Sequence, residues 1–176
     1  RPYDLPSAAA VERLVIVVLR GTCTLPATEI SSEPLPPNLI LASSAVVDGK
    51  VLPFSWVDCA ALNRFVGPSL AAQPEAERAY LYGRAIARLL AHEFYHVLGQ
   101  TENHTQSSIA KARFRISDLL AEHFDFEDVA LTRVRTAEPR SLEQYPSLTF
   151  PEANTPEVNP PGAILPDMGD VPLAGK

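Results

Sequence analysis

Residues 74–99 constrain the fold most, because they predict one long helix on which other elements must pack. Proline is favoured at the start of a helix, so Pro74 marks its beginning. Glu75 and Glu77 suit the first turn, where the helix dipole favours negative charge. Alanine-rich sequence follows, and Gly99 suits a left-handed stop at the C-terminal end.

Apolar segments ahead of this helix predict a small sheet. Residues 12–20 form a β-branched apolar run, which suits a strand buried on both faces. Residues 39–47 and 50–57 are two further β-prone runs. The dipeptide Asp48-Gly49 joins them, and this is the strongest short-range signal for a β-hairpin.

Pro53 lies in the second arm of the predicted hairpin. Proline has no backbone N–H to donate within a sheet, so this arm is predicted to be an edge strand. An edge strand can pair with an extended peptide, which makes residues 51–57 a candidate for holding substrate. The alternative is a plain structural strand whose aromatic residues belong to the core.

Shorter helices and a proline-rich tail are expected after the long helix. Ser117 and Asp118 suit the cap of one short helix, and residues 127–134 suit a further one. Eight of the chain's 17 prolines lie in the last 40 residues, where periodicity is lost. We therefore predict an α+β domain over residues 1–136 and a tail or wrap-around segment over 137–176.

The charge balance argues against nucleic acid as a partner, since 15 Lys and Arg are scattered among 21 acidic residues and the net charge is −6. No run approaches the ~18 apolar residues of a membrane span. The expected protein is a monomer that acts on a peptide or protein substrate. A removed export signal is compatible with the first residue, Arg1, so a secreted or periplasmic location is expected.

Two cysteines, Cys23 and Cys59, leave several readings open. In an exported protein a disulfide between them would close a loop of about 36 residues and contribute roughly 3–4 kcal/mol. Two unrelated buried thiols are the alternative. A further reading makes Cys23 a metal ligand that acts as a latency switch.

His92, Glu93 and His96 form a metal-binding pattern near the end of the long helix. Residues four apart lie on one helix face, so both imidazoles can reach one tetrahedral ion at about 2.0–2.1 Å. Glu93 can instead reach a water at the ion's open position and act as general base. The alternative is a buried helix with two satisfied core histidines.

A third ligand must come from another part of the chain. His104 is favoured, because imidazole suits zinc and the loop that carries it is polar. Glu102 is an alternative in the same loop. Glu122 or His123 could supply the ligand from the next helix. A solvated loop carboxylate is the simpler reading for Glu102, and a surface helix residue is the simpler reading for His123.

The sequence of residues 92–96, with Gly99 and His104 after it, resembles the metzincin branch of zinc-dependent peptidases, whose pattern is His-Glu-x-x-His-x-x-Gly-x-x-His. The resemblance covers about 20 residues. It implies a zincin-like fold, in which a small sheet packs on the active-site helix. It also implies one zinc ion on His92, His96 and His104, with Glu93 as the base.

Two departures make the chain a divergent, small, bacterial-looking relative. The third histidine of the family falls at the position of Glu102, so His104 requires a loop two residues longer. The family's methionine turn has no counterpart, because Ala110 stands where it is expected and the only methionine is Met168. A glutamate-zincin arrangement with Glu122 as the third ligand is the structural alternative.

These residues predict a zinc metallopeptidase, an endopeptidase rather than an exopeptidase, in which Glu93 activates a zinc-bound water. Tyr82, Tyr95 or an arginine could stabilise the oxyanion, and the sequence does not choose among them. One alternative is a non-catalytic zinc-binding or peptide-binding protein with a protease-like fold. Another is a hydrolase that acts on a non-peptide amide.

Overall fold

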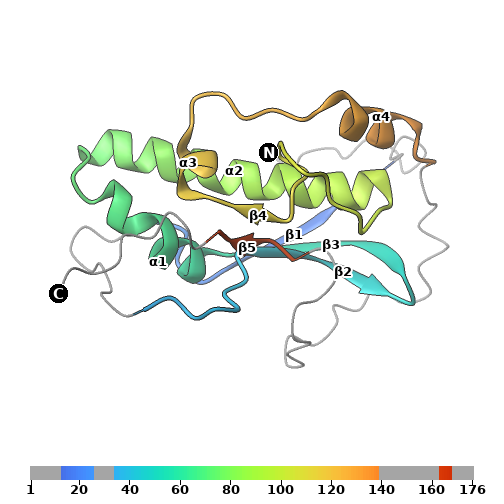
Figure 1. Ribbon diagram of the computed structural model, residues 1–176. Coiled ribbons are helices and arrows are strands. Elements are labelled where there is room, and N and C mark those ends of the chain that lie inside the picture. The colour runs from blue at the N-terminus through green and yellow to red at the C-terminus, as the bar shows by residue number, and fades with distance from the viewer. Residues whose placement is uncertain (1–12, 26–33, 139–162, 168–176) are drawn as a thin grey trace, which may run out of the picture.

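A small mixed sheet and a long helix pack together in the computed structural model of the chain, which describes residues 13–25, 34–138 and 163–167 (Figure 1). The strands are β1 (Ile16–Arg20), β2 (Ala42–Val47), β3 (Lys50–Asp58), β4 (Arg113–Phe114) and β5 (Leu165–Pro166). The helices are α1 (Cys59–Leu70), α2 (Glu75–Gly99), α3 (Ile116–Leu120) and α4 (Asp128–Thr136). The α+β class is therefore confirmed. No helix in the described ranges is long and apolar enough to cross a membrane.

The predicted hairpin forms, with β2 and β3 antiparallel. Asp48 and Gly49 have φ angles of 51° and 68°, so both occupy the left-handed region that the tightest hairpin turns require. β1 pairs with the other side of β3 in parallel, which gives the strand order β1-β3-β2. The prediction that the second hairpin arm is an edge strand is therefore wrong, and its backbone is paired on both sides.

Pro53 fits inside this central strand because it lies where neither ladder needs its N–H. The pairing with β1 starts one residue later, at Phe54. On the other side the register with β2 shifts between Ser44 and Val46, opposite Pro53. β1 is the edge strand instead. Its residues are half-buried and Leu19 is 48% exposed, so the prediction of a strand buried on both faces is also wrong.

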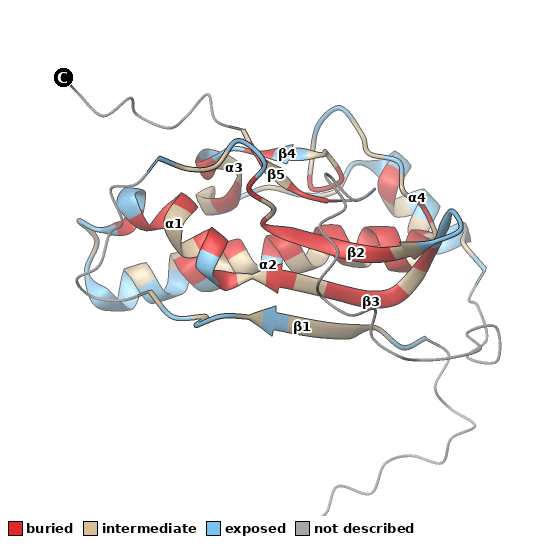
Figure 2. Cartoon of the chain, turned by 90° about the horizontal axis from the view of Figure 1, so that it is seen from below, coloured by how far each residue is buried: buried red, intermediate tan, exposed pale blue. Residues whose placement is uncertain are grey.

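α2 lies along one face of the sheet, and α3 and α4 pack against it (Figure 1). Buried residues gather along β2, β3 and the neighbouring side of α2, whereas β1 stays intermediate or exposed (Figure 2). The helix has the predicted bounds, but its left-handed cap is Gln100, at φ 47°, rather than Gly99. Gly99 serves a different purpose, because a Cβ there would lie 3.3 Å from the Cγ atom of Arg133 on α4.

α1 is a helix that the sequence patterns did not predict. Gly67 and Pro68 stand inside it and argue against a helix. The helix nevertheless begins with a strong cap, since the carboxylate of Asp58 accepts a hydrogen bond of 2.9 Å from the amide of Ala61. Its apolar side joins the main core, together with residues of β2, β3, α2 and α3.

The short helices differ in detail from expectation. α3 begins after Arg115, whose amide donates to the Asp118 carboxylate at 2.7 Å, so Ser117 is not the cap. α4 agrees with the helix predicted over 127–134.

Residues 163–167 pack between β2 and β4. Ile164 is fully buried, its amide donates to the carbonyl of Ala42 at 2.9 Å, and its carbonyl accepts from Leu41 at 3.0 Å. Apart from residues 137, 138 and 163–167, the predicted tail over 137–176 lies outside the described residues.

A disulfide joins Cys23, after β1, to Cys59, the first residue of α1. This settles the choice between the paired and unpaired readings in favour of the disulfide. It also removes Cys23 as a candidate metal ligand, because its sulfur is bonded to carbon and sulfur and is no longer a thiolate.

Candidate metal site

Three histidines converge at the C-terminal end of α2. His92 and His96 leave one face of the helix a turn apart, and His104 comes from the loop that follows. One ligand nitrogen from each ring lies within 4.8 Å of the other two. The Nε2 atoms of His92 and His96 are only 2.8 Å apart. The His104 ring stacks on that of His92, with centroids 5.2 Å apart, and meets that of His96 edge to face.

Backbone carbonyls orient both helical histidines. His92 Nδ1 lies 2.6 Å from the carbonyl oxygen of Ile109, and His96 Nδ1 lies 2.7 Å from that of Thr101. A carbonyl can only accept, so each Nδ1 carries the proton and each Nε2 presents its lone pair. Carbonyl partners of this kind accompany most metal-ligating histidines.

This donor set fits a metal ion. Two lone pairs that face each other at 2.8 Å repel unless a proton or a cation lies between them. A tetrahedral ion with nitrogen ligands at about 2.0–2.1 Å separates them by about 3.3 Å, so a small adjustment of the rings accommodates it. The Nε2 atom of His104 is buried and has no hydrogen-bond partner in the described part of the chain. It therefore offers a third nitrogen.

Burial keeps all three imidazoles neutral. Desolvation lowers the pKa of His92 well below its usual 6.5, and the neighbouring His96 lowers it further. Desolvation also lowers the pKa of His96, to about 4, and that of His104. Neutral imidazole is the form that binds metals, so protons compete weakly for this site at pH 7.

Glu93 is fully buried and points toward the sheet. Its Oε2 accepts a hydrogen bond of 2.6 Å from the hydroxyl of Ser44 on β2, which is 2.8 Å from the hydroxyl of Ser55 on β3. Its Oε1 is buried with no partner in the described residues. Desolvation raises the pKa of Glu93 well above its usual 4.5, while the Ser44 hydrogen bond opposes the rise. Such a carboxyl ionises readily only beside a positive charge.

The other candidate ligands lie elsewhere. Glu102 is half-buried, with its Oε1 beside Gly49 at the hairpin turn. Glu122 and His123 are exposed beyond the end of α3. None of the three belongs to the cluster of His92, His96 and His104, which is the group in the described ranges whose side chains lie close enough to hold a metal ion.

The tyrosines that sequence reasoning considered for an oxyanion site have other partners. The Tyr82 hydroxyl donates to the carbonyl of Cys59 at 3.2 Å, and desolvation raises its pKa to about 12. Tyr95 packs with Ala110 and Ala130, in a small cluster between α2 and α4. Ala110, at the expected place of a methionine turn, is thus a core residue, and Met168 lies outside the described residues.

Four contributors to the site were not predicted: the side chains of Ser44 and Ser55 and the carbonyls of Ile109 and Thr101. The serines left a signal, because each is a polar residue inside one of the two β-prone runs of the predicted hairpin. The carbonyls left none, since every residue has one and only the fold decides which of them faces an imidazole.

Comparisons of the chain with models of known protein families, with curated proteins and with solved structures found no match.

Proposed function

We propose that this protein is a zinc-dependent hydrolase of peptide bonds, of the zincin type and with an endopeptidase's mode of action. The observation that carries the proposal is the convergence of His92, His96 and His104, with a buried glutamate directly after the first of them. Three nitrogen ligands are the set that catalytic zinc sites use, because they leave a fourth position open. When bound there, zinc would polarise a substrate carbonyl and lower the pKa of a water toward ~7.

The chain's own residues would divide the remaining work. His92 and His96 hold their Nε2 atoms in place through the carbonyls behind them. Glu93 would accept a proton from the attacking water and pass it to the leaving amine. Ser44 fixes one oxygen of that carboxyl through a 2.6 Å hydrogen bond, which leaves the other oxygen for proton transfer. A nearby divalent cation would favour the ionised form that a base requires.

A non-catalytic zinc protein is the second candidate, and the burial of Glu93 favours it. A carboxyl that points toward the sheet and bonds to Ser44 can serve the packing of α2 on the sheet alone. In that case zinc would tie His104 to the helix and stabilise the fold without turnover. The two candidates differ in what removal of the Glu93 charge does.

The test compares wild type with Glu93→Gln, which preserves the shape and the Ser44 hydrogen bond but cannot accept a proton. Zinc content is measured by elemental analysis, and hydrolysis is followed with casein and a library of fluorogenic peptides. The enzyme reading expects one zinc per chain in both proteins and a loss of roughly 100-fold or more in the variant's rate. Glu102→Gln, a matched change outside the cluster, should keep both zinc and rate.

Equal inertness of wild type and Glu93→Gln on every substrate, with zinc retained in both, would support the non-catalytic reading. Absence of zinc from the wild type after zinc loading would remove both. Cleavage within the peptides, rather than from their ends, is expected of an endopeptidase.

The disulfide supports a secreted or periplasmic location, because such bonds persist in oxidising compartments. Alkylation of the protein in intact cells, with and without prior reduction, tests this. If both cysteines react without reduction, the protein resides in a reducing compartment and the location is wrong.

A further inference from the structure

The loop over residues 104–111 supplies two separate parts of the histidine cluster. His104 stands at its start, and the carbonyl of Ile109 orients His92 from near its end. The loop closes on itself, since the amide of Thr105 donates to the carbonyl of Ala110 at 2.9 Å and Thr105 bridges to Lys111. A shift of this closed loop would therefore move both parts together.

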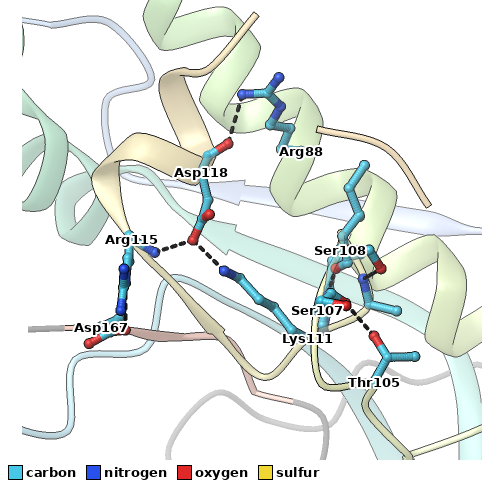
Figure 3. A network of polar contacts seen from close by, with 11 residues as sticks. Arg88, Thr105, Ser107, Ser108, Lys111, Arg115, Asp118 and Asp167 are labelled. Carbon is cyan, nitrogen blue, oxygen red and sulfur yellow. Dashed lines mark hydrogen bonds and ion pairs between the residues drawn. The ribbon is translucent and has the colours of Figure 1, made fainter. Parts of the chain in front are cut away.

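An ion pair ties the end of this loop to α3. Lys111 Nζ lies 2.5 Å from the Oδ2 atom of Asp118, and the same oxygen accepts from the Arg115 amide at 2.7 Å (Figure 3). The backbone carbonyl of Asp118 in turn accepts from the guanidinium of Arg88 at 2.7 Å. Arg88 is on α2, one turn before His92, and is only 7% exposed. The helix α2, which carries two of the ligands, thus also holds Asp118, the residue that binds the end of the loop carrying the third ligand.

We propose that the Lys111–Asp118 ion pair is a positioning device for the metal. Through the chain Arg88, Asp118, Lys111 it sets the distance between α2 and the loop, and so places the His104 nitrogen and the Ile109 carbonyl for metal binding. This inference rests on the metal site proposed above. Neither charged residue touches the cluster, so both act through the loop.

Partial burial strengthens the attraction between Lys111 and Asp118. The Lys111 and Asp118 side chains are 20% and 18% exposed, so water screens them less than it screens a surface pair. Lys111 Nζ lies over the rings of Phe114 and Phe124, at 5.9 and 5.4 Å from their centroids. Phe114 also contacts the His92 ring edge to face, at a centroid distance of 5.6 Å, which joins the pair to the site by packing.

The test measures zinc affinity of Lys111→Met by competition with a chelating dye. Changes behind metal ligands typically weaken binding 10–100-fold, and a loss of about 10-fold or more is expected here. Asp118→Asn approaches the same bond from the other side and retains an acceptor for the Arg115 amide. The double variant should lose no more affinity than either single one, because one bond is broken in all three. Lys111→Arg keeps the charge and should restore most of the affinity.

Arg113→Met is the matched control, since it removes one positive charge from an exposed position two residues away. Its zinc affinity should equal that of wild type. The visible spectrum of the cobalt-loaded protein adds a readout of ligand geometry, which should change in Lys111→Met and not in Arg113→Met. Thermal unfolding of the metal-free variants checks that each one folds.

The outcomes separate this inference from the function it rests on. If wild type binds zinc and folded Lys111→Met binds it equally tightly, the positioning role is wrong and the metal site stands. Strictly additive losses in the double variant would also overturn it. If wild type binds no zinc, the site and the inference fall together.

Discussion

Reduction of the bond between Cys23 and Cys59 should destabilise the protein without loosening the histidine cluster. The two residues are 36 apart in sequence, so the bond closes a loop of that length in the unfolded chain. In the chain-entropy account, closing such a loop removes roughly 13 cal/mol/K from the unfolded state, which corresponds to about 3.8 kcal/mol at 25 °C. A midpoint of thermal unfolding lower by about 8–15 °C follows for a protein of this size.

The expected loss can be separated from damage to the core. Cys59 is fully buried at the start of α1, so replacing its side chain would also leave a small cavity. Cys23 is half-buried, and Cys23→Ala breaks the same bond with little loss of packing. Chemical reduction of the wild type and the Cys23→Ala substitution should therefore lower the free energy of unfolding by similar amounts.

The assay is urea unfolding of metal-free protein, followed by far-ultraviolet circular dichroism, for oxidised wild type, reduced wild type and Cys23→Ala. A loss below about 1 kcal/mol in both altered proteins would refute the reasoning, because the closed loop would then constrain nothing. The zinc content of Cys23→Ala should equal that of wild type. Loss of zinc would contradict the assignment of Cys23 to the disulfide alone.

Further predictions concern titration and the third ligand. Burial raises the folded-state pKa of Glu93 well above its usual 4.5, so the stability that the neutral carboxyl contributes is fully present below pH 4.5 and is lost as the pH rises toward the folded-state pKa. In urea titrations, metal-free wild type should therefore lose stability relative to Glu93→Gln as the pH rises above 4.5. Burial raises the pKa of Tyr82 to about 12, so the stability that its neutral hydroxyl contributes is present below pH 10 and is lost as the pH rises toward 12. The loss is worth up to about 2.7 kcal/mol of unfolding free energy, and Tyr82→Phe should not show it. In metal analyses His104→Ala should release zinc, whereas Glu102→Ala should retain it.

Each of these expectations has a contrary outcome. Parallel stability profiles of wild type and Glu93→Gln as the pH rises above 4.5 would mean that the carboxyl is not buried as described. The same alkaline loss in Tyr82→Phe would assign it to another group. Zinc release by Glu102→Ala alone would move the third ligand to the position that the metzincin pattern gives it.

Local chemistry explains why much of the site could be predicted. The positions of His92 and His96 on one helix face follow from helical periodicity alone, and the turn at Asp48 and Gly49 follows from the φ angles those residues tolerate. His104 could be selected because it offered the right atom at a reachable distance in sequence. These predictions needed no knowledge of tertiary structure.

Predictions failed where neighbours in space decide the outcome. Pro53 indicated an edge strand, but the start of the β1 ladder and the register shift in β2 remove the need for its N–H. The Asp58 cap and burial in the core outweigh Gly67 and Pro68 in α1. The approach of Arg133 gives Gly99 a role that no local pattern contains.

The measurement that tests the central claim most directly is diffraction from crystals of the zinc-loaded protein on either side of the zinc absorption edge. The account predicts one anomalous peak within about 2.0–2.1 Å of a nitrogen of His92, His96 and His104, with both helical rings bound through Nε2. A peak bound by Glu102, or no peak among these three rings, would contradict it.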